Sequence, residues 1–69
     1  MEVGIGTRIK TIRTANGMRQ VDLAERASLS AVAVSHIERG ISQPRASTIK
    51  ALADALGCSP GALLETPGT

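Results

Sequence analysis

The sequence predicts a compact all-α domain built from five short helices. Apolar residues recur at helical spacing along the chain, and no segment shows the sustained alternation of a half-buried strand. Turn-forming residues interrupt the chain at regular intervals, at Asn16-Gly17, Ser28, Gly40, Pro44, Gly57 and Ser59-Pro60. A chain of 69 residues buries only about 60% of its unfolded surface, so we expect a single domain with one modest core over residues 1–69.

Composition argues against several classes of function. Hydrophobic residues make up 42% of the chain and charged residues 20%, which is typical of a globular domain. No stretch approaches the ~20 apolar residues of a membrane span, and residues 1–10 lack the apolar segment of a signal peptide. We therefore expect a cytoplasmic protein with no membrane contact. There is no Phe, Tyr or Trp on which single-stranded bases could stack.

Metal and cofactor sites are not expected. Cys58 is the one cysteine and His36 the one histidine, which is too few for a disulfide or a cysteine-based zinc site. So small a domain leaves little room for a cofactor or an enclosed small-molecule site, and we expect neither. The net charge of +2 and the high isoelectric point suit an anionic partner without requiring one.

The first helix is predicted over residues 4–15. Its apolar stripe consists of Ile5, Ile9 and Ile12, which share one face. Gly17 follows at a position suited to a left-handed cap, so we expect the helix to end just before it.

The second helix is predicted over residues 20–27, with an inward stripe of Leu23, Ala24 and Ala27. Its N-cap is Arg19, whose side chain cannot accept a backbone hydrogen bond as Ser or Asp would. We therefore expect this helix to be poorly capped.

The third helix is predicted over residues 31–39. Ser30 is a favourable N-cap and Gly40 a favourable stop. Val34 and Ile37 lie three residues apart and are expected to face the core together.

The fourth helix is predicted over residues 48–56, capped by Ser47 and ended by Gly57, and the fifth over residues 60–65, capped by Ser59. Their apolar residues are Ile49, Leu52, Ala53 and Leu56, then Leu63 and Leu64. Neighbouring helical residues point about 100° apart, so one of the two adjacent leucines should stay available for a partner. This favours a homodimer with its interface at Leu63 and Leu64. Residues 66–69 are expected to form a ragged tail.

Only residues 28–30 join the second and third helices, which favours the steep crossing of a helix-turn-helix over about residues 20–39. Val32 should point about 160° away from the core residue Val34. The outward stripe is then Val32, Ser35, His36 and Arg39, with Ala31 beside its first turn. This stripe has small side chains, hydrogen-bonding groups and no acid, which suits close approach to base edges in a major groove.

These residues resemble the phage-repressor and Cro class (XRE-type) of helix-turn-helix domains over roughly residues 5–64. The motifs that carry the resemblance are Gln20-Val21-Asp22-Leu23-Ala24, Leu29-Ser30, Val34-Ser35-His36-Ile37-Glu38-Arg39-Gly40 and Pro44. The resemblance implies a lambda-repressor-like fold of five helices and double-stranded DNA as the partner. It also implies a homodimer on a pseudo-palindromic operator, with the third helix in the major groove.

The resemblance also implies roles for individual residues. The implied DNA contacts are Arg19, Gln20, Ser30, Ala31, Val32, Ser35, His36, Arg39 and Arg45. Gln20 would contact a phosphate or position the recognition helix, whereas Arg39 and Arg45 would reach the DNA backbone or a groove edge. Arg13 and Glu38 resemble the pair that ties the first helix to the end of the third.

Two departures from the family pattern affect these expectations. Ser28 stands where the family often has glycine, at a cost of roughly 1 kcal/mol if its φ is positive. Ala31 and Val32 stand where polar residues are expected, so specificity would depend on thymine methyl groups, His36 and DNA shape.

Other interpretations stay open. The apolar start of the third helix, residues 31–34, is compatible with a module that binds a protein partner and has weak or no sequence-specific DNA binding. His36 and Val32 are also compatible with ordinary surface positions, and Cys58 with core packing. Catalysis is remote: residues 47–50 match the Ser-x-x-Lys motif of acyl transfer, but the other motifs of that chemistry are missing.

Overall fold

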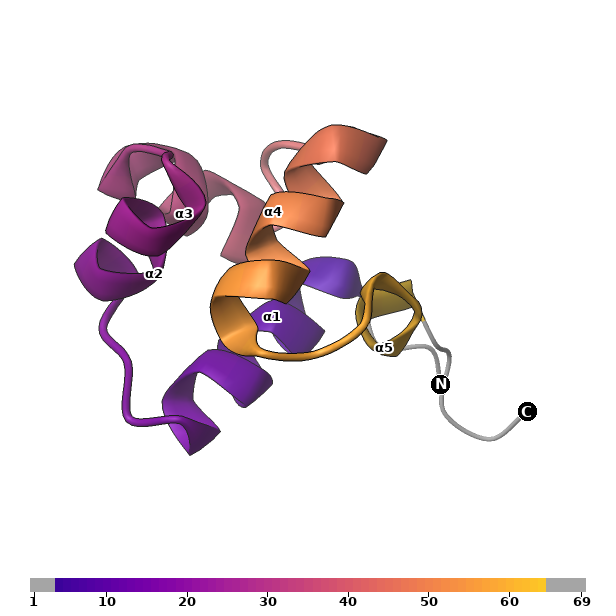
Figure 1. The fold of residues 1–69 in the computed structure, drawn as a ribbon. Helices are drawn as coiled ribbons and strands as arrows, with labels where there is room; N and C mark the ends of the chain where they lie inside the picture. Colours follow the sequence, from indigo (N-terminus) through magenta and orange to yellow (C-terminus); the bar gives the residue numbers. More distant parts are fainter. Residues whose placement is uncertain (1–3, 65–69) are drawn as a thin grey trace.

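The computed structural model describes residues 4–64, in which five α-helices and no strand are found (Figure 1). The helices are α1 (Ile5–Ala15), α2 (Gln20–Ala27), α3 (Ala31–Glu38), α4 (Ala46–Leu56) and α5 (Pro60–Leu64). The all-α class and the order of the elements are confirmed. The predicted end of the last helix at Glu65 and the predicted tail 66–69 lie outside the described residues.

The core is aliphatic and every helix contributes to it. The largest fully buried side chains are Ile9, Leu23, Val34, Leu52 and Leu63, one from each helix. Helix α2 packs against both α3 and α4, while α1 packs against α3, α4 and α5. Cys58 is partly buried and packs against the same core, as expected for a small apolar residue.

The start of α4 differs from the prediction. The helix begins at Ala46, two residues before the predicted Thr48, and its N-cap is Arg45 instead of Ser47. The backbone explains the difference, because the carbonyl of Arg45 accepts a 2.9 Å hydrogen bond from the N–H of Ile49. This bond starts the helical ladder without any side-chain cap, and Ser47 lies inside the first turn.

Smaller differences occur at other helix ends. Gly4 is the N-cap of α1 and Arg39 is the C-cap of α3, where both were predicted as helical residues. Gly17 has a left-handed φ of 69° after α1, as predicted. Such one-residue differences are usual at frayed helix ends and leave the faces of the helices unchanged.

Ser28 is the one non-glycine residue of positive φ among residues 4–64, with φ 58° and ψ 42°. A side chain in this left-handed region costs roughly 1 kcal/mol, so we expect Ser28→Gly to raise the free energy of unfolding by about that amount. Urea denaturation followed by circular dichroism measures the change. Ser30→Gly is the matched control. Ser30 has an ordinary φ of −83°, so glycine relieves no strain there, and the substitution removes the side-chain cap of α3. A Ser28→Gly variant no more stable than the parent would contradict this account.

Candidate nucleic-acid interface

Helices α2 and α3 form a helix-turn-helix whose turn is held by backbone and side-chain hydrogen bonds. The N–H of Leu29 donates to the carbonyl of Ala24 at 2.8 Å, which closes the end of α2. The hydroxyl of Ser30 accepts from the N–H of Ala33 at 3.0 Å and caps α3. These two bonds, of which the Ser30 cap was predicted, fix where α3 begins relative to α2.

The two sides of α3 differ sharply in exposure. Val34 and Ile37 are buried in the core, whereas Val32 is 63% exposed. We call the outward residues the α3 face: Ala31, Val32, Ser35, His36 and Arg39, of which Ser35 and His36 are half-buried and the others exposed. The face agrees with the orientation predicted from helical geometry.

The C-terminal end of α3 is tied to α1 by a buried ion pair. The Nε of Arg13 donates to Oε2 of Glu38 at 2.6 Å, and Nη2 donates to Oε1 at 3.0 Å. The third nitrogen of the guanidinium, Nη1, donates to the carbonyl of Met18 at 2.7 Å. The side chains of Arg13 and Glu38 are only 9% and 1% exposed, so this predicted pair is a buried, bidentate contact.

Gln20 joins this ion pair from the start of α2. Its Nε2 donates to Oε1 of Glu38 at 3.1 Å, and the contact is partly buried. Gln20 was expected either to contact a phosphate or to position the recognition helix. Its contact with Glu38 corresponds to the second role. Three donated hydrogen bonds therefore keep the carboxylate of Glu38 away from the α3 face.

The N-terminus of α2 has a side-chain contact that the sequence analysis missed. The guanidinium of Arg19 has only donor groups and cannot accept a hydrogen bond from the helix backbone. The backbone N–H of Arg19 instead donates to Oδ2 of Asp22 at 2.9 Å. The guanidinium of Arg19 also donates to both oxygens of Asp22 at 3.0 Å. These bonds, led by the one from the side chain of Arg19, lower the pKa of the Asp22 carboxyl to about 2. The charge of Arg19 is therefore partly balanced within the chain. The sequence signal for this contact is the acid Asp22, which stands three residues after the N-cap Arg19.

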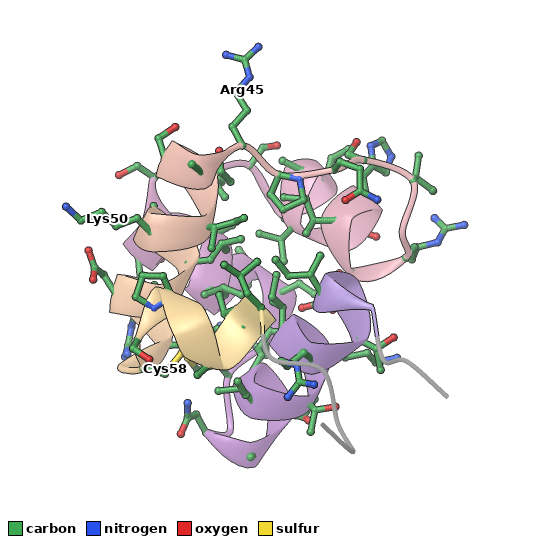
Figure 2. The ribbon with its side chains drawn as sticks, turned by 90° about the vertical axis from the view of Figure 1, so that its right-hand side faces the viewer. Arg45, Lys50 and Cys58 are labelled. Atoms are coloured by element: carbon green, nitrogen blue, oxygen red, sulfur yellow. The ribbon has the colours of Figure 1, made fainter. Side chains whose placement is uncertain are left out.

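A basic segment continues from the α3 face into α4. Residues 39–53 contain no acid and include Arg39, Arg45 and Lys50, all exposed. Figure 2 shows Arg45 extending away from the body of the domain at the start of α4. The segment also exposes Ile41, at 60%, whose N–H is held by the carbonyl of His36 at 2.8 Å. Neither Lys50 nor Ile41 was expected from the sequence to belong to this surface.

A hollow of about 330 Å³ separates the end of α3 from the start of α4. Its floor is apolar, with Leu29, Ala33, Ile37 and Pro44, and its rim is polar, with Ser42, Gln43, Arg45, Ser47 and Thr48. Arg45 and the α3 residues Ala33 and Ile37 thus line the same hollow.

The two adjacent leucines of α5 have different environments. Leu63 is 1% exposed and belongs to the core, whereas Leu64 is 58% exposed. The expectation that one of the pair stays available is confirmed. The assignment of Leu63 to a dimer interface is wrong, because α1 and α4 pack against α5 and cover its inner side.

Within residues 4–64, no group of three His, Cys, Asp or Glu side chains comes together as metal ligands. None of the helices described is both long enough and apolar enough to cross a membrane.

Comparison with known proteins gives a consistent result. Residues 9–63 match a protein-family model described as helix-turn-helix. An immunity repressor protein of Bacillus phage phi105 is 43% identical over 60 residues, which are 87% of this chain. The chain therefore spans less than half of that repressor, since the match covers 42% of its length.

Solved structures agree in fold and in sequence. The DNA-binding domain of the P22 c2 repressor is 37% identical, with a TM-score of 0.87 over 90% of this chain and 82% of that one. The P22 c2 repressor in complex with a synthetic operator is 36% identical, with a TM-score of 0.83 over 88% and 92%. The restriction-modification controller protein C.AhdI from Aeromonas hydrophila is also 36% identical, with a TM-score of 0.84 over 86% and 89%.

Proposed function

The chain belongs to the helix-turn-helix family of DNA-binding regulators, and we propose that it is a sequence-specific regulator of transcription. It binds double-stranded DNA as a homodimer on a pseudo-palindromic operator, with α3 in the major groove. The two half-sites then lie about one helical turn apart, roughly 34 Å, or a multiple of it.

The exposed α3 face is the observation that carries this proposal. It combines small side chains, one hydroxyl, one imidazole and one guanidinium, while the acid of α3, Glu38, is buried. A face of this kind can approach base edges without repelling phosphates. The similarity to the P22 c2 repressor, whose structure includes a synthetic operator, supports the same use of this surface.

The proposal divides the surface into two kinds of contact. Ala31, Val32, Ser35 and His36 contact base edges, where the hydroxyl of Ser35 and the imidazole of His36 can each donate or accept a hydrogen bond. The other proposed contacts, which reach the backbone or groove edge, are Arg19, Ser30 at the α3 N-terminus, Arg39 and Arg45. Gln20 acts through Glu38, by holding α3 in place.

Leu64 supports the proposed dimer. It is exposed on a helix that packs against α1 and α4 with its other side. A domain of this size is marginally stable alone, and association buries further apolar surface. The dimer interface therefore centres on the outer side of α5.

The proposal is tested by selection of duplexes from a random pool at near-physiological salt, followed by sequencing. The purified protein should enrich a two-fold symmetric motif. The double variant Ser35→Ala/His36→Ala should flatten the sequence preference while keeping non-specific binding. Arg45→Ala is the matched comparison, because it should weaken all duplexes alike and reduce the salt slope of binding by about one. An unchanged motif with the double variant would contradict the assignment of α3.

A second function has one specific observation in its favour. Val32, in the first turn of α3, and Ile41, just after the end of that helix, expose apolar side chains at 63% and 60%. A module that binds a protein partner would use such side chains, with weak or no preference among DNA sequences. Absence of duplex binding in the selection would favour this module over the regulator.

A further inference from the structure

Val32 is the most exposed of the large hydrophobic residues described in the structure, at 63%. It lies in the first turn of α3, next to the exposed Ala31 and one turn before Ser35 and His36. Val34, two residues later, is 1% exposed and packs in the core, whereas Val32 contributes nothing to the core. The methyl groups of Val32 are therefore free to contact a partner at the N-terminal end of the α3 face.

The groups around Val32 do not discriminate between donors and acceptors. The hydroxyl of Ser35 and the imidazole of His36 can each donate or accept a hydrogen bond. No carboxylate or carboxamide stands on the α3 face, since Glu38 is held by Arg13 and Gln20. Side chains that accept only, such as carboxylates, select the N4 amino group of cytosine, and none is exposed along this helix.

We infer that Val32 binds the C5-methyl group of a pyrimidine base, and that this site takes 5-methylcytosine as well as thymine. This inference rests on the proposed function. The two bases carry the methyl group on the same ring carbon and differ at C4, where thymine has a carbonyl oxygen and cytosine an amino group. A valine contacts the methyl alone, and a hydroxyl such as that of Ser35 suits either group at C4. Binding therefore responds to methylation of cytosine in the operator.

The expected size of the effect follows from the area that one methyl group buries. Removal of one methyl from water against an apolar side chain changes a binding constant by about fourfold. A symmetric operator has two half-sites, so the same change in both should alter the affinity of a dimer by roughly sixteenfold.

The experiment uses the duplex enriched by the wild-type protein. At each pyrimidine of one half-site, four versions are made, with thymine, uracil, cytosine or 5-methylcytosine, and their Kd values are measured by fluorescence anisotropy. At one position, thymine should bind about fourfold more tightly than uracil, and 5-methylcytosine about fourfold more tightly than cytosine. Val32→Ala should abolish both ratios. This exposed substitution by a better helix former should leave the fold intact.

Val21→Ala is the matched control, because Val21 is also an exposed valine, at 48%, but lies on α2. It should leave both ratios unchanged. Equal binding of thymine and uracil at every position would overturn the inference, as would ratios that persist in Val32→Ala. A preference for thymine without one for 5-methylcytosine would also overturn it. Failure of the proposed function looks different, since the wild-type protein would then enrich no duplex at all.

Discussion

Replacement of Glu38 by alanine is expected to remove a large fraction of the free energy of unfolding of the domain. The variant keeps the guanidinium of Arg13 buried, at 9% exposure, without its carboxylate partner. Breaking one side of a buried ion pair costs about 3–5 kcal/mol. A domain of this length has a total stability of the order of 3–10 kcal/mol, so the loss is a large fraction of it. Urea denaturation followed by far-UV circular dichroism measures the change.

The control removes both charges together. In Arg13→Met/Glu38→Leu, apolar side chains replace the pair, and no buried charge is left alone. Such replacements are often neutral or stabilising, so the double variant should recover most of the stability that Glu38→Ala loses. A Glu38→Ala variant that loses less than about 1 kcal/mol would show that the site is wet and that the pair contributes little.

Gly6→Ala is expected to destabilise the domain by about 3 kcal/mol, at the upper end of overpacking effects. A Cβ at this position would overlap the carbonyl oxygen of Ile37 and lie 2.8 Å from that of Glu38. These are backbone atoms at the end of α3, and they cannot turn aside as a flexible side chain would. The first turn of α1 must therefore move away from α3. Urea denaturation gives the loss, and loss of operator binding under folding conditions would report a displaced α3.

Gly61→Ala is the control for the glycine prediction. Gly61 is also helical, but a Cβ there would meet only the hydroxyl oxygen of Ser59, at 3.9 Å. Alanine restricts the unfolded chain and suits a helix, so this variant should gain roughly 0.5–1 kcal/mol. Similar effects of the two substitutions would mean that helix propensity, not the contact with α3, decides the outcome at Gly6.

Both predictions concern the same end of α3. Gly6 lets the backbone of α1 approach the carbonyl groups of Ile37 and Glu38, and Arg13 holds the carboxylate of Glu38 about two turns further along α1. Helix α1 is thus the platform that sets the position of α3. Variants of these residues test stability and placement of the α3 face without changing that face itself.

The sequence alone determined the helices, the turn between α2 and α3, and the side of α3 that faces outward. These features follow from local rules, because each residue advances a helix by about 100° and because caps act within one turn. Val32 and Val34 were therefore assigned to opposite sides correctly. Local rules also explain the error at α4, where a backbone hydrogen bond from Ile49 to Arg45 replaced the expected cap.

Only the tertiary structure decided which of Leu63 and Leu64 is buried, that Gln20 contacts Glu38, and that Gly6 touches the end of α3. The partners in the last two contacts lie 18 and more than 30 residues apart in the chain, so no local pattern reveals them. From the sequence, a glycine early in a helix is expected only to weaken that helix. The structure shows that a side chain at Gly6 would overlap the backbone at the end of α3. The angle and distance at which helices pack determine such contacts, and these depend on the whole core.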